Sequence, residues 1–137
     1  MADPMTELRG AMVDQMLADA TLVAMVHSRI YDEVPQSNTT VRLPYISLGP
    51  QNYAPELVDC IDGGEIMIQV DVWSNEPGQS EVSVIAGAVR KSLKGFEPDL
   101  TETAVVEFYH WRTDFLVDGA IKHAAIRFNA VVEETSS

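Results

Sequence analysis

The chain has 137 residues, of which 46% are hydrophobic, and this is enough for one globular domain that needs neither disulfides nor a metal. Nine Lys and Arg residues against 21 Asp and Glu residues give a formal net charge of −12, which argues against a protein that grips a nucleic-acid backbone through cations. With Cys60 as its single cysteine the chain forms no internal disulfide, and without a signal-like start or a long apolar run we expect a soluble protein made in the cytoplasm, with no membrane contact.

The first part of the chain predicts two helices. Asp3 followed by Pro4 is a typical helix start, and the apolar residues after it recur at helical spacing, so we predict an amphipathic helix over residues 4–18. Asp19 can cap a second, short helix that carries Leu22, Val23 and Met25.

Short strands and two loops are predicted between Ser28 and Gly64. The strand candidates are Ile30-Tyr31 and residues 45–48, and prolines and glycines interrupt the chain around them. We therefore predict exposed loops over residues 33–43 and 50–64, the second of them acidic.

The clearest strand pattern covers residues 65–73. One face of this strand carries only β-branched residues, namely Ile66, Ile68, Val70 and Val72, which predicts one buried face and one wetter face. After a turn at 75–78, apolar spacing predicts a helix from Ser80 to Leu93, with Ser80 as its cap and Gly95 as the glycine that ends it.

Two more strands complete the pattern. Residues 104–115 are rich in β-branched and aromatic residues, Asp118-Gly119 is a hairpin signal, and residues 122–132 alternate again, before a polar tail over 133–137. The order α-α-β-β-β-α-β-β predicts a single α+β domain over residues 1–137. Its sheet should be antiparallel or mixed, with helices packed mainly on one face.

No residue pattern for catalysis stands out. The three histidines, His27, His110 and His123, have no cysteine or carboxylate at metal-ligand spacing. His110 and His123 could become neighbours in the last hairpin, either as a metal or proton-relay pair or, as we favour, as two half-buried strand residues. We expect no catalytic, cofactor-binding or metal site.

The tryptophans leave two interpretations open. Trp73 belongs to the wetter face of its strand, and Trp111 lies in the aromatic strand beside Tyr109. Such side chains either pack under a loop or anchor a subunit interface, where Trp, Tyr and Arg are enriched. We take four residues as interface candidates: Trp73, Tyr53, Arg42 and Arg112.

Three stretches in fixed order resemble a known family. They are Arg29-Ile30-Tyr31-Asp32 with Val34-Pro35 and Leu43-Pro44-Tyr45-Ile46; Val70-Asp71-Val72-Trp73-Ser74; and Arg112-Thr113-Asp114 with Asp118-Gly119 and Lys122-His123. In this order they resemble the tail completion proteins (tail terminators and head–tail joining proteins) of long-tailed phages, prophages and gene transfer agents.

The resemblance implies a structural virion subunit in the neck region of a tail, made in the bacterial host cytoplasm. Such a subunit forms a ring, commonly of six copies, that ends polymerisation of the tail tube protein and docks the head connector or stopper protein. The family is not enzymatic and needs no cofactor, and DNA passes through the ring without specific binding. An acidic channel wall would repel the DNA phosphates.

The residues themselves leave two other functions open. One is a monomeric adaptor that binds an unrelated protein. The other is a small-ligand or enzyme domain with its site between sheet and helices, which would need convergent polar groups in an apolar pocket.

Overall fold

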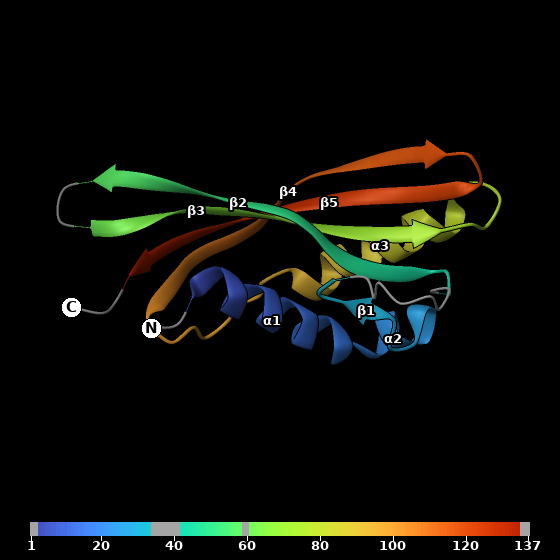
Figure 1. Cartoon of the computed structure of the whole chain (residues 1–137). Helices are drawn as coiled ribbons and strands as arrows, with labels where there is room; N and C mark the ends of the chain where they lie inside the picture. The colour runs from blue at the N-terminus through green and yellow to red at the C-terminus, as the bar shows by residue number, and fades with distance from the viewer. Residues whose placement is uncertain (1–2, 34–41, 59–60, 135–137) are drawn as a thin grey trace.

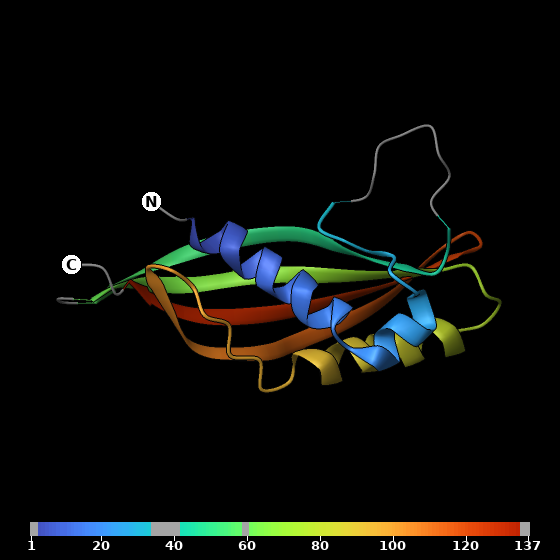
Figure 2. The same cartoon turned by 90° about the horizontal axis from the view of Figure 1, so that it is seen from below.

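A computed structural model of the chain describes residues 3–33, 42–58 and 61–134, which form three helices and five strands in the predicted order. The strands make one mixed sheet in the order β1-β2-β3-β5-β4. All three helices lie on one side of this sheet (Figures 1 and 2). We call that side the helix face and the opposite side the open face. The predicted α+β fold class is confirmed.

The first two helices start where their acidic caps predict. Helix α1 (Pro4–Leu17) follows Asp3, whose carboxylate accepts hydrogen bonds from Met5 N at 3.2 Å and Thr6 Oγ1 at 2.7 Å. Helix α2 (Ala20–Val26) follows Asp19, whose carboxylate accepts a hydrogen bond from the Thr21 N–H at 2.9 Å. The bonds from the Met5 and Thr21 N–H groups satisfy amides that have no partner inside the helix.

Helix α3 (Ser80–Leu93) ends as predicted, but it already begins at Ser80, the residue predicted to be its cap. The residue before it is Gln79, which makes no side-chain capping bond, and Ser80 is already helical, so the prediction of a Ser80 cap is wrong. Gly95 follows the helix with a φ of +72°, a left-handed conformation that favours glycine. Among the described residues, no helix is both long and apolar enough to cross a membrane.

Four of the strands are longer than the sequence pattern predicts, and the first, β1, has the predicted bounds. The five strands are β1 (Ile30–Tyr31), β2 (Tyr45–Val58), β3 (Ile61–Ser74), β4 (Thr103–Asp118) and β5 (Ile121–Glu134). Strand β1 pairs with β2 in parallel, and the other three pairings are antiparallel. The predicted Asp118-Gly119 hairpin is confirmed, since β4 and β5 pair up to Asp118 opposite Ile121.

The predicted loop over 50–64 is wrong, because these residues belong to the long β2–β3 hairpin. Pro50 lies at an irregularity in the pairing between Leu48 and Gln51, and β1 covers only two residues of β2, so Pro55 lies in an edge segment where proline is tolerated. Figures 1 and 2 show this hairpin reaching past the start of α1.

The glycines of this hairpin also have a reason within the sheet. A Cβ on Gly63 would collide with the Val132 carbonyl oxygen, and one on Gly64 would lie 2.5 Å from the Ala54 carbonyl oxygen. Most of the other predicted loop, 33–43, lies outside the described residues. The polar tail is also corrected, since Glu133 and Glu134 belong to β5, while 135–137 lie outside the described residues.

The hydrophobic core lies between the helix face and the helices. The predicted apolar face of β3 contributes Ile66, Ile68, Val70 and Val72, none more than 1% exposed. Helix α1 adds Leu8, Met12 and Met16, and α3 adds Val82, Ile85, Val89 and Leu93. Each such side chain stabilises the fold by roughly 1.5–3 kcal/mol when fully buried. The open face has no such cover from the helices (Figure 1).

Candidate functional site

The open face of the sheet is the candidate functional site, because it presents aromatic and charged side chains that no helix covers. Residues opposite one another on neighbouring strands share a face, so the strand register arranges the open face in rows. From the β4–β5 turn toward the β2–β3 turn these rows are Tyr45–Trp73–His123–Leu116, Ser47–Asp71–Ala125–Asp114, Gln69–Arg127–Arg112, Asn52–Met67–Asn129–Tyr109, Ala54–Glu65–Val131–Glu107 and Glu56–Gly63–Glu133–Ala104. The rows form an aromatic end, a polar middle and an acidic end.

The aromatic end is built around Trp73. Its ring stacks on His123, with 3.9 Å between centroids and 9° between planes, and on Tyr45 at 6.2 Å. Its indole Nε1 donates a hydrogen bond to Ser47 Oγ at 3.1 Å. Burial, together with the charge of Asp71, raises the pKa of Tyr45. Trp73 is therefore held by strand neighbours on its own face.

A hollow of about 520 Å³ lies against this aromatic cluster. Apolar side chains from three segments line it, including Leu43, Leu116 and Ile121. Leu116 is 49% exposed, although it is large and apolar. A partly exposed aromatic and aliphatic surface of this kind is typical of protein contacts.

The polar middle begins at a buried carboxylate, Asp71. His123 Nε2 lies 2.5 Å from Asp71 Oδ1, and Gln69 Nε2 donates a hydrogen bond to the same oxygen at 2.7 Å. Asp71 is 5% exposed and Gln69 is 8% exposed. The close approach of β2 depends on Gly49, since a Cβ there would collide with the Asp71 carboxylate.

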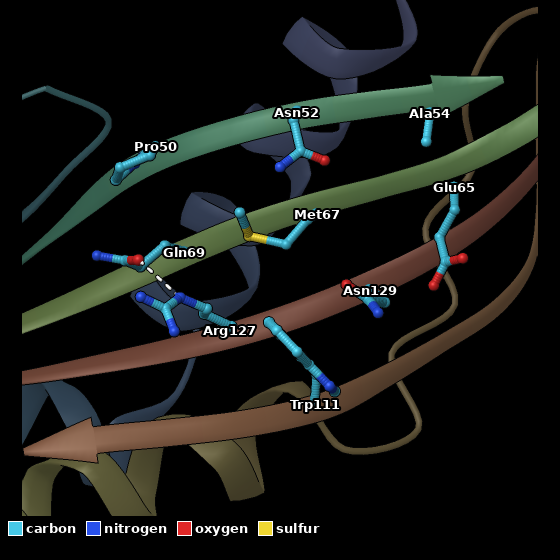
Figure 3. A pocket seen from close by; sticks show the side chains of 9 residues that line it. All are labelled: Pro50, Asn52, Ala54, Glu65, Met67, Gln69, Trp111, Arg127 and Asn129. Atoms are coloured by element: carbon cyan, nitrogen blue, oxygen red, sulfur yellow. Dashed lines mark hydrogen bonds between the residues drawn. The ribbon is translucent and has the colours of Figure 1, made fainter.

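Arginines continue this chain of hydrogen bonds across β5 and β4. Arg127 Nε donates to Gln69 Oε1 at 3.1 Å (Figure 3), and its Nη1 donates to Asp114 Oδ2 at 2.9 Å. Arg112 Nη2 donates to the other Asp114 oxygen at 2.8 Å. The charged groups of the middle rows therefore satisfy one another, which suits a rigid platform.

Trp111 lies beside this series of hydrogen bonds, and its side chain is on the open face (Figure 3). The β4–β5 pairing is irregular between His110 and Arg112, and the bulge puts Trp111 and Arg112 on the same face although they are consecutive. The Arg112 guanidinium carbon lies 5.7 Å from the Trp111 ring centroid. Trp111 is 52% exposed and borders a hollow of about 560 Å³ with Met67 and Asn129 (Figure 3).

The acidic end lies beyond this hollow. Four glutamates fall in its two neighbouring rows: Glu56, Glu65, Glu107 and Glu133. Glu65 accepts a hydrogen bond from the Tyr109 hydroxyl at 3.0 Å. None of the four forms an ion pair with another described residue. This end of the face therefore carries unbalanced negative charge.

The four predicted interface residues do not form one cluster. Trp73 and Arg112 share the open face but lie in different rows. Tyr53 is opposite Ile66, so it faces the helix side, where it is 40% exposed. Arg42 is exposed in the segment before β2. Their part in an interface stays a prediction.

The last hairpin does not bring the two strand histidines together. His110 is opposite Phe128, and His123 is opposite Leu116, so the two are not cross-strand neighbours and the pair considered from sequence is wrong. Within residues 3–33, 42–58 and 61–134, no three His, Cys, Asp or Glu side chains are grouped so that they could hold a metal ion.

The sequence pattern did not predict the series of hydrogen bonds that runs from Gln69 through Arg127 to Asp114. The available signal was the alternation of β3, which puts Gln69 and Asp71 on the same face as Trp73. The partners of these two residues come from strands more than 50 residues away, such as Arg127 and His123. Local spacing does not show that contact.

Known proteins give two kinds of match. The sequence matches the family model described as Tail completion protein gp17 over residues 10–133. A chain in the virion of a native gene transfer agent (GTA) particle is 27% identical with a TM-score of 0.87, and the match covers 97% of this chain and 99% of that one. The bacteriophage SPP1 gp17 protein is 17% identical with a TM-score of 0.60, covering 96% and 93% of the two chains, which shows a shared fold. None of the curated protein sequences compared with the chain matches it.

Proposed function

The chain belongs to the tail completion protein gp17 family, and from this premise we propose that it forms a ring that ends the tail tube and joins tail to head. Membership makes it a structural component of a phage-like tail. The proposed ring lies at the head-proximal end of the tail, in the neck region, and contains six copies of a single domain spanning residues 1–137.

The observation that carries the proposal is the likeness to a chain of an assembled GTA virion. That chain is matched along almost its whole length, at a TM-score of 0.87, so the two proteins share their complete architecture. The open face supports an assembly role as well. It presents Trp111 and Leu116 about half exposed, and large exposed apolar side chains on a sheet mark protein contacts.

The proposed partners are further copies of this chain, the tail tube protein and the head connector or stopper protein. Closing a ring needs two different, complementary patches on each copy. DNA passes through the ring without specific binding, and the net charge of −12 keeps it from sticking to the wall.

Particles assembled without this protein test the proposal. We expect electron micrographs to show overlong tails, or heads and tails left unjoined, and we expect the wild-type chain supplied in trans to restore normal particles. Tails of normal length joined to heads in the absence of the protein would overturn the proposal. A chain that stays monomeric and binds one unrelated host protein would instead indicate an adaptor.

A further inference from the structure

We propose that neighbouring copies of this chain join by laying the outer side of α3 of one copy on the acidic end of the open face of the next. This inference rests on the proposed ring and names the two surfaces that close it. The two surfaces lie on opposite sides of the sheet (Figures 1 and 2). Contact between them is therefore head-to-tail, the kind that builds rings.

The outer side of α3 changes from apolar to cationic along its length. From Ser83 onward, the exposed or half-exposed residues of this helix are Ser83, Val84, Gly87, Arg90 and Lys91, and Lys94 follows directly after it. In the first turn, Ser80 is exposed, and the half-exposed Glu81 accepts a hydrogen bond from Ser74 Oγ at 2.6 Å. Val84 is 55% exposed, and Gly87 leaves room beside it, since a Cβ there would meet only the Arg90 guanidinium at 3.6 Å. A hollow of about 430 Å³ between α2 and α3 includes Val84 and Gly87, with Arg90 and Lys91 also lining it.

The cations at the end of α3 carry charge that the described part of the chain does not balance. Arg90, Lys91 and Lys94 account for three of the nine Lys and Arg residues. None of them pairs with a carboxylate of the described residues. Copies with a net charge of −12 repel one another, so a stable contact between them needs cations on one side. This cluster supplies them.

The acidic end of the open face has the complementary order. Trp111 borders the hollow in the middle of the face, and the four unpaired glutamates follow toward the β2–β3 turn. From Trp111 to Glu107 the strand advances about 13 Å. From Val84 to Lys91 the helix advances about 10 Å, and to Lys94 about 15 Å. The distance from the apolar residue to the first charged residues is therefore comparable on the two surfaces.

These matches define the contact. The exposed Trp111 ring packs into the Val84–Gly87 hollow of the neighbouring copy, where a buried aromatic anchor is typical of interfaces. Arg90, Lys91 and Lys94 of the neighbouring copy then face Glu56, Glu107 and Glu133 of the copy that supplies Trp111. The positive and negative charges at the contact balance. The helices of the neighbouring copy would also cover the open face of the first copy, which the first copy's own helices leave uncovered.

Charge reversal on each surface tests the contact. The first variant is Arg90→Glu, Lys91→Glu and Lys94→Glu, and the second is Glu56→Lys, Glu107→Lys and Glu133→Lys. Glu65 is left unchanged because it accepts the Tyr109 bond. A matched control, Asp14→Lys, Glu33→Lys and Asp99→Lys, makes the same charge change as the second variant at exposed carboxylates outside both surfaces.

We expect each variant alone to be folded, by circular dichroism, and to self-associate at least about 100-fold more weakly than wild type, because like charges now meet. An equal mixture of the two variants restores association, since opposite charges meet again at every contact. Native mass spectrometry then shows rings with the variants in equal number. The control variant associates like the wild-type chain.

The same samples are added to tails assembled without the protein. This second assay also tests the contact if the ring closes only when it is bound to a tail. We expect the mixture, but neither variant alone, to restore tails of normal length. Rescue by either variant alone, or failure of the mixture while the control works, would overturn this contact. Variants that form normal rings but no longer bind tail tube protein would assign the two surfaces to that partner instead. Normal particles without any of the protein would overturn the proposed function and not only this contact.

Discussion

Replacing Asp71 with alanine should destabilise the fold by about 2–4 kcal/mol, although Asp71 lies outside the hydrophobic core. The substitution removes the acceptor of Gln69 Nε2 and the partner of His123 Nε2, at 2.7 and 2.5 Å. A buried polar group left without a partner costs about 1–3 kcal/mol. Gln69 is 8% exposed and pays the larger share, whereas the His123 side chain is 18% exposed and reaches some water.

Urea denaturation followed by circular dichroism measures this loss as a lower midpoint at an unchanged slope. Asp71→Asn is the matched variant, because it keeps an acceptor oxygen for Gln69, and we expect it to lose only about 1 kcal/mol. Asp114→Asn, in a carboxylate 34% exposed, should lose about 0.5 kcal/mol, as partly exposed ion pairs do. A loss below about 0.5 kcal/mol for Asp71→Ala would show that the polar chain does not stabilise the open face.

Substitutions at three further positions test the fold. Phe128 is 2% exposed and stacks on Phe108 with 5.3 Å between ring centroids. Phe128→Ala should lower the free energy of unfolding by about 3–5 kcal/mol, and a loss below about 1.5 kcal/mol would contradict its place in the core. Asp19→Ala should lower the free energy of unfolding by about 1 kcal/mol, measured by thermal or urea denaturation, because α2 loses its cap. Asp19→Ser keeps a capping oxygen and should leave the free energy of unfolding nearly unchanged. Burial and the nearby Arg90 lower the pKa of His110 below 6.5. As the pH drops through 6.5, the unfolded chain therefore takes up this proton before the folded chain does, and the free energy of unfolding falls. His110→Gln should make the unfolding midpoint depend less on pH between pH 7.5 and 5, and an unchanged pH dependence would refute the assignment.

Local signals in the sequence were sufficient for the helices and for one face of the sheet. Asp3 and Asp19 precede helices whose amides they bond, and Gly95 ends α3 in a left-handed conformation. The alternation of β3 predicted its buried face because the period of a strand is set locally. These features need no knowledge of distant contacts.

The β2–β3 hairpin could not be predicted in the same way. Pro50 and Pro55 usually break strands, and only the sheet order shows that they lie at a pairing irregularity and in an edge segment. Gly63 and Gly64 look like turn residues, yet they are needed because neighbouring backbone carbonyls approach them closely. Their role follows from pairing between distant segments.

The open face depends on long-range register in the same sense. Trp73 was predicted to lie on the wetter face of its strand, and it does, but its stacking partner His123 comes from β5. The direction of Trp111 depends on a bulge that spacing alone does not reveal. The rows that connect these residues exist only once three strands are paired.

Tube growth in a purified system tests the central claim most directly. Tail tube protein is polymerised alone and with increasing amounts of this chain, and tube lengths are measured by electron microscopy. We predict that tubes become shorter as the chain is added and that each carries a ring of it at one end. Tubes of unchanged length, with this chain left free in solution, would contradict the claim that it ends the tail.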